Sequence, residues 1–166
     1  IVVTTVNDAP VAVADIATVS EDAATTSFDV IANDTDEEED TLTLTLVNTS
    51  GTGTVAINSD GVSVDYTPAV DFNGTEVITY TVSDGILTDE TGILKVTVTP
   101  VNDAPIAVSD TYIVLEDAAT TGIDVITNDT DVDTGDILTL IAVASLGTAT
   151  VSINSDGFSV DYTPAP

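Results

Sequence analysis

The stretch LKVTVT at residues 94–99 alternates apolar and polar side chains with a period of two. Because successive side chains of a β-strand point to opposite faces, this pattern predicts a strand with Leu94, Val96 and Val98 on one buried face. The same alternation, rich in β-branched and aromatic residues, recurs in TLTLTLV (41–47), VSVDY (62–66) and EVITYTV (76–82). We therefore expect an all-β chain whose strands bury one face and leave the other in water.

Turn-forming segments such as NTSGTG, NSDG, FNG and SDG separate these stretches, and no window shows a helical period with caps. With the shorter runs VAVADIATV, FDVIA and TVAI, the sequence predicts about seven strands in roughly 95 residues. That number at that spacing is typical of an Ig-like antiparallel β-sandwich.

The phrase VNDAP occurs at residues 6–10 and again at 101–105, which marks an internal repeat. A shift of 95 residues (101 − 6) also aligns the two copies of EDAATT and of NDTD, and one inserted residue then moves the shift to 96. We expect the tail of a preceding repeat at 1–5, a complete repeat at 6–100 and a second repeat at 101–166. The second repeat has no counterpart of residues 71–100, which hold its last two strands. The sequence thus predicts a piece of a longer array, with another copy of the chain as one candidate to complete the second repeat.

The composition limits the possible classes of function. The chain has 29 acidic residues and a single basic one, Lys95, and its net charge is −28. Nucleic acid is excluded as a partner, since binding phosphate needs Lys and Arg. No apolar run is long enough for a transmembrane helix, so we expect no direct membrane insertion. An enzyme is not expected, because without His, Cys or Arg only a carboxylate pair could act as acid and base. The acids also lie in loops that recur between repeats, which favours ligation over catalysis.

The loops NDTDEEED (33–40) and NDTDVDTGD (128–136) carry closely spaced acids. The candidate ligands are Asp34, Asp36, Asp40, Asp129, Asp131, Asp133 and Asp136. Carboxylates this close repel one another, and a divalent cation reverses that effect. Oxygen ligands without Cys or His favour Ca²⁺. The loops are not EF-hands, because Glu39 or Thr134 stands where that motif has Gly. The other interpretation is a solvated loop that binds no specific ion.

VNDAP also allows two interpretations, because it lies where consecutive repeats join. Asn7 and Asp8, with Asn102 and Asp103, could merely form turns that start the first strand of each repeat. Alternatively, their oxygens could contribute to a metal site that straddles two repeats and stiffens the joint.

TYTVSDG followed by LKVTVTPVNDAP resembles the closing strands and calcium linker of a cadherin repeat. The whole unit, with its EDAATT, NDTD, DYTP and FNGT phrases, is similar to the cadherin-like, VCBS-type and RTX adhesin repeats of giant bacterial surface proteins. The resemblance implies an extracellular or cell-surface stalk of Ig-like domains rigidified by Ca²⁺. By position it adds ligand roles to the VNDAP residues, to Asp34, Asp36, Asp129 and Asp131, and to Glu21, Glu116 and Asp84. Pro100 and Thr5 replace the first Asp of the cadherin linker, so we expect one or two ions per joint.

The leading hypothesis is therefore a calcium-rigidified extender of a bacterial adhesin, with neighbouring repeats of the same chain as its partners. The alternative is a carbohydrate- or protein-binding module. Sugar sites usually present an aromatic platform, and this chain has four Tyr and three Phe. Tyr66, Tyr80 and Tyr162 alternate with apolar residues, so we expect them in the core.

Overall fold

The computed structural model describes residues 6–165, and the chain divides into two compact units, Ile1–Val101 and Asn102–Pro166. The expected tail of a preceding repeat, at 1–5, lies outside the described residues. The described residues contain no helix that could span a bilayer.

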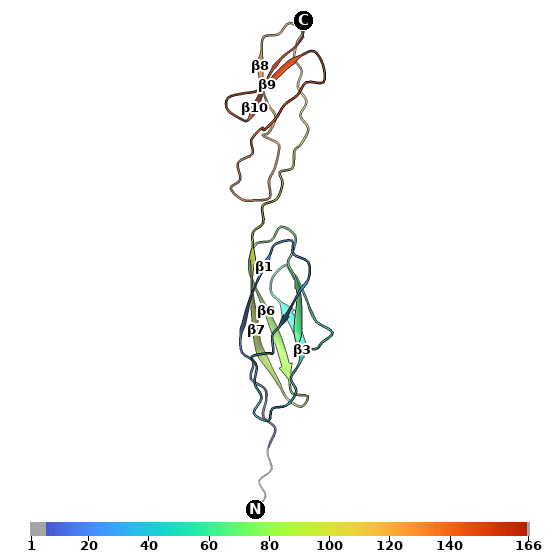
Figure 1. The fold of residues 1–166 in the computed structure, drawn as a ribbon, viewed down its shortest axis with the longest axis vertical. Coiled ribbons are helices and arrows are strands. Elements are labelled where there is room, and N and C mark those ends of the chain that lie inside the picture. Colours follow the sequence, from blue (N-terminus) through green and yellow to red (C-terminus); the bar gives the residue numbers. More distant parts are fainter. Residues whose placement is uncertain (1–5, 166) are drawn as a thin grey trace, which may run out of the picture. The chain divides into compact units, whose positions relative to one another are not determined.

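The first unit is a two-layer β-sandwich (Figure 1). Its strands are β1 (Asp15–Ser20), β2 (Thr26–Asp29), β3 (Thr43–Thr49), β4 (Thr54–Ile57), β5 (Ser63–Thr67), β6 (Gly74–Ser83) and β7 (Thr88–Thr99). One sheet has the order β1-β7-β6-β3 and the other the order β2-β5-β4. Neighbouring strands are antiparallel except β1 and β7, which are parallel. The all-β sandwich and the seven strands predicted from the sequence are confirmed.

The core of this unit depends on β6 and β7, which form the centre of the four-stranded sheet. Leu94, Val96 and Val98 of β7 are buried, as their alternation predicts, and so are Ile78 and Tyr80 of β6. The same cluster contains residues from the other strands and loops: Val19, Val30, Leu44, Val64 and Tyr66. Because both sheets contribute, removing β6 and β7 would uncover the inner face of the β2-β5-β4 sheet.

Tyr80 shows how closely the two central strands pack. It lies opposite Gly92 in the β6–β7 register, and a Cβ atom on Gly92 would come within 2.2 Å of the Tyr80 ring. The Tyr80 hydroxyl lies 2.9 Å from the carbonyl oxygen of Val30 and 3.1 Å from the carboxylate of Asp15. Burial raises the pKa of Tyr80, and the nearby carboxylates of Asp34 and Asp15 raise it further. Tyr66 and Tyr80 are therefore core residues, as expected.

The second unit repeats one sheet of the first. Strands β8 (Thr121–Asp124), β9 (Thr150–Ile153) and β10 (Ser159–Thr163) pair in the order β8-β10-β9. Thr121 lies opposite Tyr162, as Thr26 lies opposite Tyr66 in the first unit. An isolated bridge between Ile106 and Thr130 likewise matches the bridge between Val11 and Thr35.

The second unit has three strands where the sequence led us to expect five. The stretches 110–115 and 139–145 align with β1 and β3, but neither forms a strand. In the first unit β1 pairs only with β7 and β3 only with β6, and the printed sequence holds no counterpart of those partners. Tyr162, expected in the core, is half-buried. Among the described residues of this unit, Val160 alone belongs to the buried apolar set.

Candidate metal sites in the acidic loops

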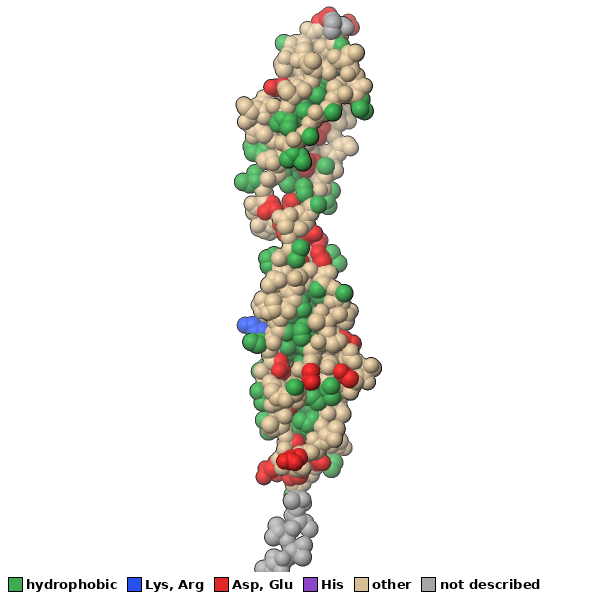
Figure 2. All heavy atoms as spheres, in the orientation of Figure 1, with side chains coloured by type: hydrophobic (Ala, Val, Ile, Leu, Met, Phe, Trp, Pro, Cys, Tyr) green, Lys and Arg blue, Asp and Glu red, His purple; other side chains and the backbone are tan. Residues whose placement is uncertain are grey.

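In the first unit VNDAP runs beside the acidic loop of the same repeat. The backbone of Val11 exchanges hydrogen bonds of 2.7 and 3.1 Å with that of Thr35, which ties the loop 33–40 to the entering chain. Two residues later the Val13 N–H donates to Asp34 Oδ1 at 2.7 Å. The loop is thus held by backbone bonds, which is why its carboxylates gather at this end (Figure 2).

The two polar residues of VNDAP contact acids from other segments. Asn7 Nδ2 donates to Asp84 Oδ2 at 2.7 Å, and the Asp8 N–H donates to Glu38 Oε2 at 3.3 Å. Hydrogen bonds from Asn7 and from the N–H groups that follow Asp84 lower the pKa of Asp84. The structure therefore brings Asn7, Asp8 and Asp84 to the end of the unit that carries the acidic loop.

Asp36 organises the loop itself. Its Oδ1 accepts hydrogen bonds of 3.1 Å from the N–H groups of both Glu38 and Asp40. Asn7, Glu38 and Asp40, with Glu37, line one shallow pocket at this end. The candidate residues Asp36 and Asp40 therefore lie beside the VNDAP residues of the same unit.

Within residues 6–165, no hydrogen-bond donor contacts two buried carboxylate oxygens at this end, Asp34 Oδ2 and Asp36 Oδ2. Burial raises the pKa of Asp34, and the charges of Asp15 and Asp89 raise it further. Burial, together with the charge of Asp29, also raises the pKa of Asp15. A buried acceptor without a donor is costly. A hard cation would supply the missing partner, so the donor set fits Ca²⁺.

Asp15 and Asp89 were not among the residues singled out from the sequence. Asp89 Oδ2 accepts a hydrogen bond of 2.9 Å from the Ala12 N–H, and this bond, with others from Thr91, lowers its pKa. Both acids lie within strands, so their alternation suggests ordinary solvent-facing positions. The register of β1, β6 and β7 places them near Asp34, and no local motif encodes that register.

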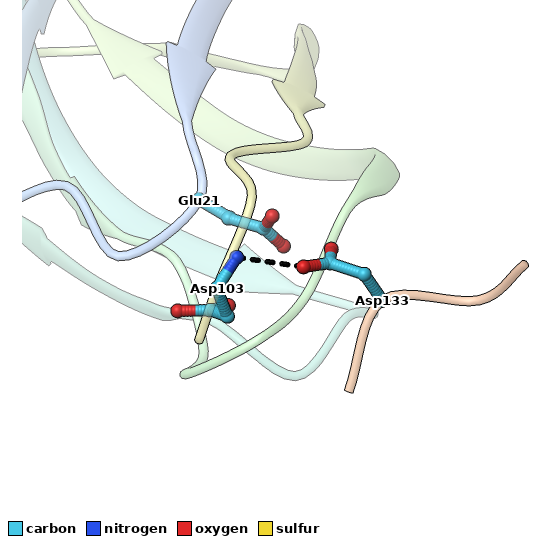
Figure 3. Close-up of side chains that lie close together, drawn as sticks. All are labelled: Glu21, Asp103 and Asp133. Carbon is cyan, nitrogen blue, oxygen red and sulfur yellow. Dashed lines mark hydrogen bonds between the residues drawn. The ribbon is translucent and has the colours of Figure 1, made fainter. Parts of the chain in front are cut away.

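The second unit shows the corresponding arrangement (Figure 3). The Asp103 N–H donates to Asp133 Oδ2 at 2.6 Å, the bond drawn in Figure 3. The Asp133 N–H in turn donates to Asp131 Oδ1 at 2.9 Å. Asp131, Asp133 and Asp136 each offer a carboxylate oxygen within 4.8 Å of the others. Asp129 Oδ1 accepts the Val108 N–H at 2.7 Å, and Asn102 Nδ2 donates to the carbonyl oxygen of Asp103. Most of the candidate residues of this unit thus lie in one group.

Glu21 and Glu116 differ although they are counterparts. Glu21, also drawn in Figure 3, is 4% exposed and accepts hydrogen bonds from the N–H of Val101 and from Asn73 Nδ2. Glu116 is exposed. Glu21 therefore fixes the last residue of its own unit, whereas Glu116 joins no cluster among the described residues. Next to Glu21, Asp22 Oδ1 accepts the Asp71 N–H at 3.1 Å.

A comparison with protein families matches the model described as "Bacterial Ig domain" twice, at residues 7–99 and 102–166. The chain belongs to the bacterial Ig domain family. The two matches support tandem Ig-like repeats, and this family indicates an extracellular or surface module. The match does not distinguish the cadherin-like, VCBS-type or RTX adhesin repeats that the sequence resembles.

Among solved structures, two of an endo-fucoidan hydrolase from glycoside hydrolase family 107 resemble the chain. They are 23% and 22% identical to it, with TM-scores of 0.41 and 0.39. The match covers 95% and 96% of this chain but 24% of each hydrolase chain. The comparison with curated proteins gives no match.

Proposed function

We propose that the chain is an extender segment of a bacterial surface adhesin whose Ig domains are stabilised by Ca²⁺. One observation carries this proposal: both units tie VNDAP to their own acidic loop through a backbone N–H. Asp8 donates to Glu38 in the first unit, and Asp103 donates to Asp133 in the second. The same bond in both units would hold the carboxylates of each acidic loop in place for a cation.

The charges support a cation as the ligand. With a net charge of −28 and only Lys95 as a base, carboxylates in these loops have almost no internal counter-charge. Asp34 and Asp36 each bury an oxygen that meets no hydrogen-bond donor from the described part of the chain. Asp131, Asp133 and Asp136 offer carboxylate oxygens that lie within 4.8 Å of one another. A bound Ca²⁺ would supply two positive charges at each cluster. The chain's own residues would hold the ion through carboxylate oxygens on anchored loops.

The distribution of aromatic residues supports an extender over a carbohydrate-binding module. Tyr66 and Tyr80 are buried in the core, so they form no exposed platform. The exposed aromatic side chains of the described residues include Tyr112 and Phe158, which lie on separate segments of the second unit. A spacer gains from repetition, whereas a single recognition site does not.

Thermal unfolding of the full chain tests the proposal, in chelator, in millimolar Ca²⁺ and in Mg²⁺. Extracellular modules bind Ca²⁺ with a Kd of roughly 10⁻⁴ to 10⁻³ M, so about 10 mM Ca²⁺ adds about 1.4–2.7 kcal/mol per site. We expect an increase in Tm of several degrees in Ca²⁺ and a smaller one in Mg²⁺. Isothermal titration would give the number of ions.

Paired variants connect the response to the clusters. Asp131→Asn and Asp133→Asn should each reduce the Ca²⁺-dependent stabilisation of the second unit. Asp156→Asn is the matched control, because Asp156 lies in an exposed turn of the same unit, outside the acidic loop, and loses the same charge. An unchanged Tm in Ca²⁺, or an equal loss in the Asp156 variant, would remove the calcium proposal. A carbohydrate- or protein-binding module would then be the better hypothesis.

A further inference from the structure

The turn that leads into β6 contains an Asn-Gly pair at residues 73 and 74. Of the eight asparagines in the chain, only Asn73 is followed by glycine. Both residues of the pair are exposed. Gly74 has φ +142°, a conformation that L side chains rarely adopt, and an added Cβ would lie 3.3 Å from the Phe72 ring. The backbone therefore requires glycine after Asn73, so the pair is a fixed feature of this turn.

Asparagine is one of the thermolabile residues, because its side-chain amide can convert to an acid. The backbone nitrogen of the next residue attacks the side-chain Cγ, and a glycine leaves that path open because it has no Cβ. The new N–Cγ bond replaces the Cγ–Nδ2 bond, and Nδ2 leaves as ammonia with the proton of the attacking nitrogen. Water then opens the cyclic imide at either carbonyl, which gives aspartate or isoaspartate. The side chain thus exchanges an NH group for an oxygen and gains one negative charge.

The asparagine of the β4–β5 turn shows how the fold can restrain such an amide. Asn58 is followed by Ser, its Nδ2 donates to Asp65 at 2.8 Å and its Oδ1 accepts the Asp60 N–H at 3.1 Å. Asn154 in the second unit is bonded through both amide atoms in the same way. Hydrogen bonds at both ends of the amide hold Cγ away from the next backbone nitrogen.

The Asn73 amide is bonded at one end. Within residues 6–165 its side chain makes a single hydrogen bond, from Nδ2 to Glu21 Oε2 at 3.3 Å. This bond is long, and the side chain is exposed. Cγ of Asn73 can therefore approach the Gly74 nitrogen more easily than Cγ of Asn58 can approach the nitrogen that follows it.

We propose that Asn73 is a site of spontaneous deamidation, and that the carboxylate formed there weakens the hold of Glu21 on the end of the first unit. Glu21 is 4% exposed, and its other oxygen accepts the N–H of Val101, the last residue of this unit. Deamidation removes the donor to Glu21 and places a like charge beside a carboxylate that is almost out of solvent. Lys95 is the sole base of the chain, so little counter-charge is available. Glu21 then moves toward water and releases Val101.

Incubation of the folded full chain at mildly alkaline pH tests the reaction, because alkaline pH favours deprotonation of the attacking nitrogen. The buffer contains chelator and the temperature is kept well below Tm, so the result does not depend on Ca²⁺ binding. Peptide mass mapping in ¹⁸O water follows the conversion, with Asn58 and Asn154 as internal references. We expect position 73 to convert tenfold or more faster than either reference, with ¹⁸O incorporated and both products present.

Two results would overturn this half of the inference. One is a rate at position 73 no higher than at the two references. The other is conversion that occurs only after the chain is unfolded in denaturant, since the exposed pair should react in the folded protein.

Three variants isolate the consequence of the new charge. Asn73→Asp introduces the aspartate product directly, and Asn73→Ala removes the donor without adding a charge. Asn48→Asp is the matched control, because it adds the same charge at an exposed position of β3. We expect hydrogen exchange at the Val101 N–H to be tenfold or more faster in Asn73→Asp than in wild type, and to change much less in the other two variants.

Glu21→Gln tests whether Glu21 senses position 73. A neutral side chain there can still accept the Val101 N–H but is not repelled by a carboxylate. Asn73→Asp should therefore accelerate Val101 exchange much less in a chain that carries Glu21→Gln than in one that does not. Equal acceleration in both chains, or equal exchange in Asn73→Asp and Asn48→Asp, would show that the new charge does not act through Glu21.

Discussion

Leu44 and Leu140 occupy the same place in the two repeats, and their backbone N–H groups make the same hydrogen bond, to Gly61 at 2.8 Å and to Gly157 at 2.9 Å. Leu44 is nevertheless 7% exposed and lies in β3, whereas Leu140 is half-buried and lies in no strand. The described second unit has no counterpart of β6, the strand with which β3 pairs, and its stretch 139–145 also differs from β3 in sequence at four of seven positions. Pairing with β6 therefore contributes to the formation of β3 and to the burial of Leu44.

The β4–β5 hairpin and its counterpart show the opposite behaviour. In both units an Asn-Ser-Asp-Gly turn closes the hairpin, with Gly61 and Gly157 each at φ +77°. Asp60 Oδ1 accepts two backbone N–H groups of its turn, and Asp156 Oδ1 does the same. This hairpin persists in the second unit because local turn chemistry specifies it.

The largest difference between the units should come from the matched pair Leu44→Ala and Leu140→Ala. Removing a buried Leu side chain costs about 2–5 kcal/mol because a cavity remains. Leu140 is half-exposed, so its truncation should cost less than about 1 kcal/mol. Hydrogen exchange read separately for each unit during denaturant unfolding gives both values. Equal costs would mean that the second unit is covered in solution.

A second pair tests the packing around Glu76. Gly53→Ala forces a Cβ against the Tyr66 ring at 2.7 Å and the carbonyl oxygen of Thr67 at 2.8 Å. Overpacking of this kind costs about 1–3 kcal/mol. The reciprocal change, Ala149→Gly, should alter the second unit by no more than the backbone effect of about 1 kcal/mol. Thermal unfolding of both variants gives the two costs, and a neutral Gly53→Ala would show that the loop between β3 and β4 adjusts easily around Glu76.

The sequence predicts the sandwich well because the apolar residues of its alternating pattern are those that the core buries. Leu94, Val96 and Val98 show this, since all three are buried as their period of two predicts. It predicts VNDAP beside the acidic loop less directly, through a resemblance. It does not reveal Asp15 and Asp89 near Asp34, because strand register brings them together. Nor does it show that Glu116 differs from Glu21, since the residues that Glu21 binds, Asn73 and Val101, follow it by 52 and 80 positions.

Glu76 provides a pH-dependent test confined to the first unit. It is 3% exposed; burial opposes its ionisation, but hydrogen bonds from Gly53, Thr52 and Tyr66 outweigh that effect and lower its pKa. A carboxyl whose pKa is lower in the folded than in the unfolded protein stabilises the fold at a pH above its unfolded pKa. This stabilisation is lost as the pH falls through the folded pKa. Glu76→Gln should therefore cost about 1–3 kcal/mol near neutral pH.

The cost of Glu76→Gln should decrease below about pH 5, where the unfolded carboxyl begins to protonate. Chemical denaturation of wild type and variant between pH 7 and pH 3 gives the difference directly. Unfolding of the second unit, which contains no counterpart of Glu76 in the printed sequence, is the internal reference. A cost independent of pH would mean that the charge of Glu76 is not what the loop requires.

Asp34→Asn should change the free energy of unfolding least of these substitutions, but the direction of the change should depend on Ca²⁺. The pKa of Asp34 is raised by burial and by the charges of Asp15 and Asp89, so its ionised form opposes folding when no cation is present. That penalty is absent below the unfolded pKa and complete above the folded one. In chelator at neutral pH the variant should therefore be more stable than wild type, by no more than about 1 kcal/mol since the site is partly exposed.

In millimolar Ca²⁺ the order should reverse, because the variant loses a charged ligand while wild type gains the bound ion. The stabilisation in chelator should also fade toward pH 3, where wild-type Asp34 is protonated. Asp60→Asn is the control: hydrogen bonds from Val62 and Ser63 lower the pKa of Asp60, so neutralising it should never stabilise. If Asp34→Asn destabilises the first unit in both chelator and Ca²⁺, Asp34 is a structural acceptor for Val13. If the variant is more stable than wild type in chelator and less stable in Ca²⁺, the folded protein positions the acidic loop as a cation site.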